Sequence, residues 1–257
     1  MSLADKIYNY LSAKEQRSGS ESELFNIFFT PNFRNNFIQH KILNYLLEND
    51  GRFRFDCSNK QWCAGIDSLS INLDEVQYCA IDVETTGFNE HTDRITEISA
   101  IKLYKGEITT HISHLINPRR CIPRRITTLT GITDNMLFDK HTFDELAPHL
   151  IEFIGESVIL AHHSNFDTRF INAELERAGH TPLENPSICT CKLARKLYPF
   201  MNNYSLDTVA KLFELKFVSR HRAYGDALMV IDIFLNFMPL FKNYGIYSLR
   251  DLLKYLK

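Results

Sequence analysis

The 257-residue sequence has no strong compositional bias, and what it lacks narrows its class. Its cysteines form no Cys-x-x-Cys pair, and no apolar run approaches the roughly 18–20 residues of a membrane span. The N-terminus lacks the basic start and apolar run of a secretory signal. We therefore expect a cytoplasmic protein with no membrane contact and reduced thiols. The cysteines are Cys57, Cys63, Cys79, Cys121, Cys189 and Cys191.

The sequence also lacks an excess of positive charge. Its net charge of −2 gives no global signature of nucleic-acid binding. Basic residues do cluster locally, and a basic rim around an acidic pocket would suit a polyanionic substrate. Each cluster is equally compatible with an ordinary solvated surface. The clusters are Arg119–Arg120, Arg124–Arg125, Lys192 with Arg195–Lys196, and Arg220 with Arg222.

Residues 1–75 differ in pattern from the rest of the chain. Three segments with helical apolar spacing are followed by two short strand-like segments. The pattern predicts a small winged-helix-like N-terminal domain, which could bind DNA, bind a protein or pack on its neighbour, since no basic recognition helix stands out. The helices are predicted over Leu3–Leu11, Glu21–Phe29 and Asn36–Leu47, and the hairpin over Arg52–Asp56 and Gln61–Ala64.

Residues 76–240 carry strands first and then helices interleaved with short strands. This order predicts an α/β domain with a mixed sheet covered by helices on both faces. Strands are predicted over Tyr78–Val83, Arg94–Tyr104, Ile108–Ile116 and Val158–Ala161. Helices are predicted over Phe143–Ile154, Phe166–Ala178, Lys192–Leu197, Leu206–Phe213 and Ala223–Phe237. A C-terminal tail, residues 241–257, is expected to close with a helix over Ser248–Leu256.

Two carboxylates, Asp82 and Glu84, stand two residues apart at the end of the apolar segment that begins at Tyr78. Side chains two apart on a strand share a face, so both can converge on one ion. An unpaired charge beside a buried strand is costly, and a divalent cation would compensate it. The alternative is a strand end that carries exposed acids by chance.

A third carboxylate, Asp167, lies in the first turn of the predicted helix that follows the strand Val158–Ala161. An acid there also complements the helix dipole and needs no catalytic role. Functional sites in α/β sheets, however, collect at the C-terminal ends of strands. The position of Asp167 therefore favours a role in a site.

A fourth carboxylate, Asp226, lies in a predicted helix on the face of Ala223 and Val230, which should point inward. A buried carboxylate on that face requires a cation. His221 stands five residues earlier, just before the helix, where it can reach over the same pocket. A lone histidine is more often structural, but this spacing from a buried acid suits a general base.

These segments together resemble a known family. The motif Asp-x-Glu-Thr-Thr-Gly at 82–87, the pair Phe166–Asp167 after an Ala-His, and the spacing from His221 to Asp226 resemble the three motifs of the DEDDh 3′→5′ exonucleases. The chain is most similar to the DnaQ-like branch, which includes the epsilon subunit of bacterial DNA polymerase III. The segment 129–132 and the pair Cys189–Thr190 also match that branch. The resemblance covers about residues 77–238, and the sequence departs from it at 163, where the family usually has Asn and this chain has His163.

The resemblance implies a ribonuclease H-like fold with a mixed five-stranded sheet flanked by helices. It also implies that four carboxylates bind two divalent ions, Mg²⁺ or Mn²⁺, with Asp82 shared between them. His221 would take the proton from the attacking water, and the product would be a nucleoside 5′-monophosphate. The metal ligands would be Asp82, Glu84, Asp167 and Asp226. The terminal nucleotide would lie among Thr85, Phe88, Leu129, Thr130, His162 and Phe166, although Phe166 also fits ordinary core packing.

The function expected from this resemblance is metal-dependent 3′→5′ exonuclease activity on single-stranded DNA ends, in proofreading or repair. The partner would be nucleic acid, together with a DNA polymerase or a repair complex. One alternative is an exoribonuclease of the same fold, because the five motif residues do not read the sugar. A third reading, an inactive nucleic-acid- or protein-binding module, is disfavoured by the intact set of acids.

Overall fold

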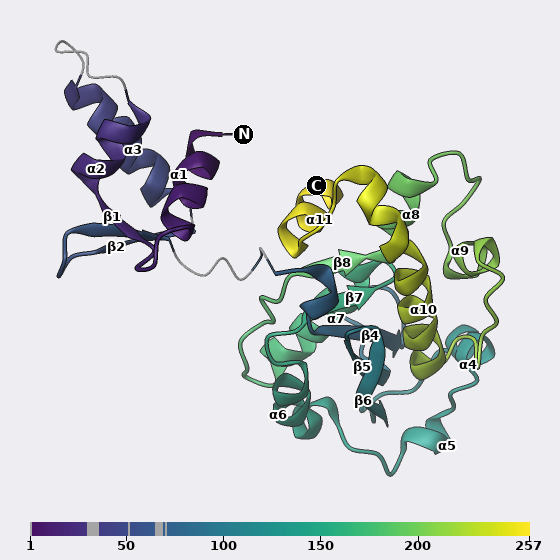
Figure 1. Ribbon diagram of the computed structural model, residues 1–257. Helices are drawn as coiled ribbons and strands as arrows, with labels where there is room; N and C mark the ends of the chain where they lie inside the picture. The colour runs from purple at the N-terminus through teal and green to yellow at the C-terminus, as the bar shows by residue number, and fades with distance from the viewer. Residues whose placement is uncertain (1, 30–35, 51, 65–68, 70) are drawn as a thin grey trace. The chain divides into compact units, whose positions relative to one another are not determined.

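The computed structural model describes residues 2–29, 36–50, 52–64, 69 and 71–257 (Figure 1). The chain divides into two compact units, Met1–Ser70 and Ile71–Lys257. The division lies before the predicted boundary at residue 75, because residues 71–75 pack with the second unit. Leu73 and Val76 are buried, and the Tyr78 hydroxyl donates a hydrogen bond of 2.9 Å to the Leu73 carbonyl.

The first unit contains three helices and a small antiparallel sheet with the strand order β1-β3-β2. The elements are α1 (Leu3–Ser12), β1 (Ser18–Ser20), α2 (Glu21–Phe28), α3 (Asn36–Glu48), β2 (Phe53–Asp56) and β3 (Gln61–Ala64). The three helices and the hairpin were predicted, whereas β1 was missed, because three small polar residues show no strand pattern. Ile7, Leu24, Leu43 and Trp62 belong to its core. A winged-helix classification of this unit remains a prediction.

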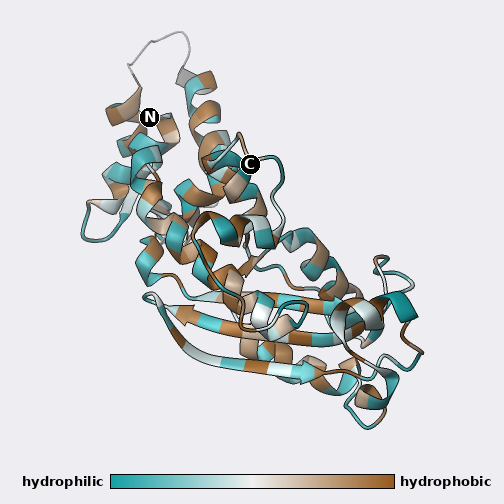
Figure 2. Cartoon of the chain, turned by 90° about the vertical axis from the view of Figure 1, so that its right-hand side faces the viewer, coloured by the Kyte–Doolittle hydropathy of each residue, from teal (hydrophilic) through white to brown (hydrophobic). Residues whose placement is uncertain are grey.

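The second unit is built on a five-stranded sheet with the order β6-β5-β4-β7-β8. The strands are β4 (Tyr78–Thr85), β5 (Ile95–Tyr104), β6 (Glu107–Leu115), β7 (Val158–Ala161) and β8 (Ser187–Cys189). β4, β5 and β6 pair antiparallel, whereas β4, β7 and β8 run parallel. Hydrophobic and hydrophilic residues alternate along the long strands, as Figure 2 shows. The predicted mixed five-stranded sheet is confirmed, with β8 as the strand that periodicity alone did not identify.

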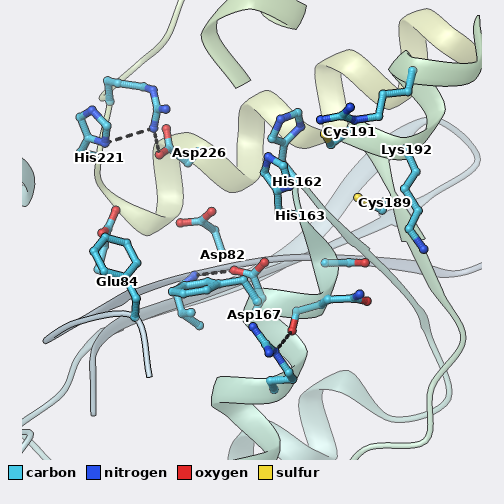
Figure 3. A pocket seen from close by; sticks show the side chains of 18 residues that line it. Asp82, Glu84, His162, His163, Asp167, Cys189, Cys191, Lys192, His221 and Asp226 are labelled. Carbon is cyan, nitrogen blue, oxygen red and sulfur yellow. Dashed lines mark hydrogen bonds and ion pairs between the residues drawn. The ribbon is translucent and has the colours of Figure 1, made fainter. Parts of the chain in front are cut away.

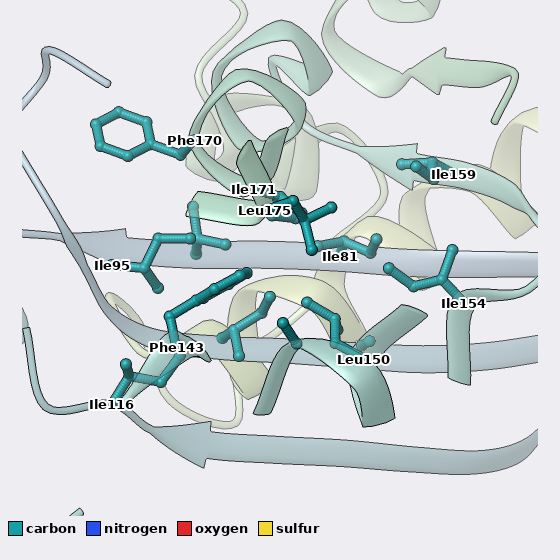
Figure 4. Packing of buried hydrophobic residues seen from close by; sticks show 14 of the residues in the cluster. Ile81, Ile95, Ile116, Phe143, Leu150, Ile154, Ile159, Phe170, Ile171 and Leu175 are labelled. Carbon is teal, nitrogen blue, oxygen red and sulfur yellow. The ribbon is translucent and has the colours of Figure 1, made fainter. Parts of the chain in front are cut away.

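Helices cover both faces of this sheet, as predicted (Figure 1). On one face, the side chains of Ile81 and Val83 pack with Phe143 of α6 (Phe143–Ile154) and Phe170 of α7 (Ser164–Arg177). Figure 4 shows this cluster from close by. On the other face lies α10 (Ala223–Phe241), whose Phe234 ring meets the Tyr78 ring edge-on at 4.9 Å. The alternation along β4 therefore turns Asp82 and Glu84 toward the α10 face.

The remaining helices are shorter and surround this core. They are α4 (Arg124–Thr130), α5 (Asp134–Leu137), α8 (Thr190–Leu197), α9 (Leu206–Leu212) and α11 (Leu249–Leu256), with two 3₁₀ turns at Leu73–Glu75 and Lys242–Tyr244. The C-terminal helix α11 belongs to the second unit. The first residue of α11 is hydrogen-bonded to the first residue of that unit: the Leu249 amide donates to the Ile71 carbonyl at 3.1 Å.

One segment of the second unit, Ala223–Tyr244, is long and apolar enough to cross a membrane by length and composition alone. No apolar run of this length was expected from the sequence, in which Asp226, Asp232 and Asn236 interrupt the segment. In the fold, 56% of the residues in its most apolar 18-residue window are buried. The helix packs on β4 and β5, so its hydrophobicity is explained by the core of the unit.

Candidate active site

Three carboxylates from two elements converge at the C-terminal end of β4. One oxygen from each of Asp82, Glu84 and Asp226 lies within 4.8 Å of the others. Asp82 and Glu84 lie on one face of β4, just before a register shift in its pairing with β5 at Glu84–Thr85. Such bulges often re-aim side chains next to sites. The predicted convergence of the first and third motifs is therefore found (Figure 3).

Asp167 reaches the same place from the first turn of α7. It is 3% exposed, and its Oδ1 accepts a hydrogen bond of 3.2 Å from the Val83 amide. This bond holds the Asp167 carboxylate against β4 at Val83, the residue between Asp82 and Glu84. The helix-dipole interpretation would need only an exposed acid, so the burial of Asp167 in the pocket wall favours the site interpretation.

Asp226 lies in the first turn of α10, on the inward face predicted for it. Ala223 and Val230, which share that face, are fully buried, and Asp226 itself is 3% exposed. The preceding loop passes very close to this turn. A Cβ atom at Gly225 would lie 2.0 Å from the Ser219 carbonyl oxygen, so only glycine permits the approach.

A buried glutamate fixes the start of α10. Glu97 on β5 is 3% exposed, and its Oε2 accepts a hydrogen bond of 3.0 Å from the Ala223 amide. The same carboxylate receives Arg222 Nη2 at 2.7 Å and Arg222 Nε at 3.1 Å. An anion at a helix N-terminus is favourable. The clamp holds residue 222 between His221 and the helix that carries Asp226.

Burial raises the pKa values of all four acids. Burial is the first cause in every case, and it raises the pKa of Glu84 to about 7, of Asp167 to about 8 and of Asp226 to about 6. The pKa of Asp82 is raised well above its ordinary value by burial and then by the neighbouring charges of Asp167 and Asp226. A bound cation would reverse these shifts by favouring the charged carboxylates.

The donor set fits a hard divalent cation. Asp226 Oδ1 is buried and has no hydrogen-bond partner among the described residues. Buried polar atoms are normally paired, so an orphan that faces two more carboxylates indicates a missing ligand. Oxygen donors without thiolate or imidazole suit Mg²⁺ or Mn²⁺ better than zinc. The residues of this site therefore fit a divalent metal ion.

His221 lines the same pocket as the four acids. It adopts a left-handed backbone conformation with φ of 58°, which turns the chain just before α10. Partial burial, and next the positive charge of Arg220, lower the pKa of the imidazole. A lowered pKa keeps the ring neutral near pH 7, which is the form that a general base requires.

The pocket has a volume of about 660 Å³. Its aromatic wall contains two of the predicted substrate residues, Phe88 and Phe166, whose ring centroids lie 6.4 Å apart. Phe88 is 67% exposed. Four arginine and lysine side chains line the pocket as well: Arg169 of α7, Lys192 and Arg195 of α8, and Arg220 before α10. The predicted basic rim is thus present at Lys192, Arg195 and Arg220, while Arg169 was not predicted.

The other predicted substrate residues lie less directly at the pocket. His162 lines it, but its Nδ1 lies 2.9 Å from Thr190 Oγ1 and its Nε2 lies 2.8 Å from the Tyr204 carbonyl oxygen. Burial lowers the pKa of His162 to about 4, so this ring is a neutral structural bridge. Thr85 is buried and donates its hydroxyl to the Gly87 carbonyl.

The last two predicted residues, Leu129 and Thr130, come from α4 and do not line the pocket. Leu129 is about half exposed, whereas the Thr130 hydroxyl is buried and donates to the Ile126 carbonyl at 3.0 Å. The same helix reaches the pocket wall through Arg125, whose guanidinium lies 5.6 Å from the centre of the Phe88 ring. Substrate contacts of Leu129 and Thr130 remain predictions.

Sequence reasoning missed two parts of the site. Glu97 and Asp207 belong to no recognisable motif, because each pairs with an arginine that is distant in the sequence: Glu97 with Arg222, and Asp207 with Arg220.

His163 departs from the family pattern, and its φ of 66° lies in the region that Asn adopts most easily among residues with a side chain. Ligand atoms of His162, His163 and Cys191 lie within 4.8 Å of one another, but both nitrogens of His162 are already engaged.

Comparison with known sequences places this site in a family. The model of the RNase_T family, described as "Exonuclease", matches residues 79–234. The chain is 37% identical over 187 residues to the DNA polymerase III subunit epsilon of Aquifex aeolicus, which covers 71% of this chain and 93% of that protein. It is 43% identical over 157 residues to the PolC-type DNA polymerase III of Clostridium perfringens. That match spans 61% of this chain but only 11% of the PolC-type protein.

Solved structures agree with the sequence comparison. Exonuclease X, solved in complex with 5′ overhanging duplex DNA, superposes with a TM-score of 0.57 at 26% identity, over 70% of this chain and 99% of that chain. Exonuclease I superposes with a TM-score of 0.59 over 66% of this chain and 43% of that one, and at 16% identity it shows the fold alone. With the acid set in place at the end of β4, the chain belongs to the RNase_T exonuclease family, in its DnaQ-like DEDDh branch.

Proposed function

We propose that the second unit is a 3′→5′ exonuclease that hydrolyses DNA ends to nucleoside 5′-monophosphates with two divalent ions, Mg²⁺ or Mn²⁺. The observation that carries the proposal is that one oxygen from each of Asp82, Glu84 and Asp226 lies within 4.8 Å of the others, while Asp226 Oδ1 is buried without a hydrogen-bond partner among the described residues. Asp167, held by the Val83 amide, completes the ligand set. When bound, the ions would supply positive charge that stabilises the reacting phosphate and activates the attacking water.

The residues of the chain would do the rest. His221, neutral because its pKa is lowered, would accept the proton of the attacking water. Phe88 and Phe166 would stack against terminal bases without selecting among them. Lys192 and Arg195, on the pocket wall, would attract the phosphates. The arrangement holds a strand end in place and leaves the chemistry to the acids and His221.

DNA is the proposed substrate because the relatives carry DNA names. Exonuclease X was solved with duplex DNA, and the most similar sequences include a subunit of DNA polymerase III and PolC-type polymerases. We infer a role in replication or repair in the cytoplasm, in contact with a DNA polymerase. Co-elution with a polymerase catalytic subunit in size-exclusion chromatography would support that contact, and separate elution at micromolar concentrations would argue against it.

The direct test is degradation of matched single-stranded DNA and RNA oligonucleotides labelled at the 5′ end, with Mg²⁺, Mn²⁺ or chelator. The expected result is a DNA ladder that shortens from the 3′ end and disappears with chelator. Asp226→Asn should abolish it, whereas Asp232→Asn, which removes an equal charge from an exposed site on the same helix, should not. His221→Ala should lower the rate by about 10²–10⁴-fold. An active Asp226→Asn variant would refute the metal assignment, and preferential RNA degradation would refute the DNA assignment.

A further inference from the structure

Arg220 is held by two carboxylates at the edge of the acid cluster. Its Nε and Nη2 each lie 3.0 Å from an oxygen of Asp207, which is a two-pronged ion pair. Its Nη1 donates to Asp226 Oδ2 and lies 3.3 Å from His221 Nδ1. Figure 3 shows His221 and Asp226 side by side at this edge of the pocket. One guanidinium thus links Asp207, a partly exposed acid outside the pocket, to an acid of the proposed metal site.

In this position Arg220 occupies an oxygen of a carboxylate that a metal ion would also bind. Asp226 Oδ2 is taken by Arg220, while Asp226 Oδ1 is the buried oxygen without a partner among the described residues. A divalent ion at the three carboxylates would therefore share Asp226 with the Arg220 guanidinium, and two cations on one carboxylate repel each other. Arginine keeps its charge at all ordinary pH values, so the conflict cannot be relieved by loss of a proton.

Asp207 gives Arg220 another place to go. Asp207 lies in the first turn of α9, its side chain is 45% exposed, and it does not line the pocket. Because both of its oxygens already receive Arg220, the guanidinium can leave Asp226 and keep its ion pair. The guanidinium carbon also lies 5.2 Å from the centre of the Phe217 ring, within the range of a cation–π contact.

We propose that Arg220 competes with divalent metal for Asp226, so that metal binding requires Arg220 to leave Asp226 and rest on Asp207 alone. The inference rests on the proposed metal-dependent function. In the metal-free protein Arg220 supplies positive charge to the acids, because its Nη1 donates to Asp226 Oδ2. Arg220 is thus a positioning residue that stabilises the empty site and raises the metal concentration needed to fill it.

The test is a titration of the full chain with Mn²⁺, in which electron paramagnetic resonance measures free Mn²⁺ and hence the dissociation constant without any turnover. Arg220→Gln should bind Mn²⁺ about tenfold more tightly than the wild type, since a partly exposed contact pair is lost. Arg195→Gln is the matched control. It removes the same charge from the same pocket but makes no ion pair with the acids, so its affinity should change by less than about twofold.

A double-mutant cycle tests the role of Asp207. Asp207→Asn should weaken Mn²⁺ binding, because Arg220 then depends on Asp226. In the Arg220→Gln background the same change should have little effect, since the residue that Asp207 holds is gone. An equal loss in both backgrounds would show that Asp207 acts only through its charge and would overturn this part of the proposal.

The remaining outcomes separate the inference from the function on which it rests. If the wild type binds no Mn²⁺, or binds it as well with Asp82→Ala, both fall. If the wild type binds Mn²⁺ and Arg220→Gln binds it equally or more weakly, only the competition is refuted. If circular dichroism shows that Arg220→Gln does not fold, the Mn²⁺ affinity of Arg220→Lys tests the competition instead. Lysine cannot bridge both acids, so its affinity should exceed that of the wild type, and an affinity at or below wild type would overturn the proposal.

Discussion

The close approach of the Ser219–His221 loop to α10 predicts that Gly225→Ala disables the site while leaving the fold intact. The new Cβ would lie 2.0 Å from the Ser219 carbonyl oxygen and 2.4 Å from the Ser219 hydroxyl. Carbon atoms do not approach oxygen within 3.0 Å in practice, so the loop must retreat by about 1 Å, and a misplacement of this size costs about 10²-fold in rate. The movement would displace His221, which follows Ser219 by two residues, and Asp226, which follows Gly225 in the helix.

Stability should respond differently from the rate. Alanine is favoured over glycine in a helix by about 1 kcal/mol, which offsets part of the clash. We therefore expect a folded Gly225→Ala variant whose free energy of unfolding changes by about 2 kcal/mol or less. A 10²-fold loss of kcat would correspond to about 2.7 kcal/mol of activation free energy. The two quantities would then be clearly separable.

The assay is single-turnover cleavage of a 5′-labelled DNA oligonucleotide with excess enzyme, paired with urea unfolding. Gly179→Ala is the control, because Gly179 has φ of 78° but open space around it. That variant should lose about 1–2 kcal/mol of stability from backbone strain and keep its rate. A Gly225→Ala variant whose single-turnover rate constant stays within threefold of wild type would refute the idea that the close approach positions His221 and Asp226.

Three further predictions concern the surroundings of the site. Glu97→Gln should cost about 1–3 kcal/mol in urea unfolding and about tenfold in kcat, because Arg222 loses its partner, whereas the exposed Glu107→Gln should change neither. Burial raises the pKa of Glu84 to about 7 and of Asp167 to about 8 in the folded protein, so metal-free protein should lose thermal stability between about pH 4 and 8. Added Mg²⁺ should restore that stability most at the high end, and a flat profile would contradict the shifts. Phe88→Ala should raise KM by about five- to tenfold through lost stacking, with Phe200→Ala, on a 98% exposed side chain, as the unaffected control.

The elements that periodicity could predict were those with a long, regular pattern. The helix over Phe143–Ile154 and the strand over Val158–Ala161 begin and end where they were predicted. The buried residues of the helix repeat every 3.6 residues, and the strand is a short continuous apolar run. The strands β1 and β8, three residues each, were missed as individual elements. A segment that short pairs because of the strand beside it, and its own residues do not reveal this.

The candidate site divides in a similar way. The five motif residues were predicted because each lies at a definite offset from a strand end or a helix start. Asp82, Glu84, Asp167, His221 and Asp226 all line one pocket in the structure. Leu129 and Thr130 followed from the resemblance alone, and they lie on α4 outside the residues that line it.

Periodicity and residue type are local properties, and they were enough to predict the longer helices and strands, the faces that these bury and the acids at their ends. How those ends are fixed and charged depends on tertiary contacts. Glu97 meets Arg222 across 125 residues, and Asp167 meets the Val83 amide across 84. Arg220 reaches both Asp207 and Asp226 because a loop folds back on α10. Such contacts depend on which strands and loops become neighbours in space, and no local pattern encodes that arrangement.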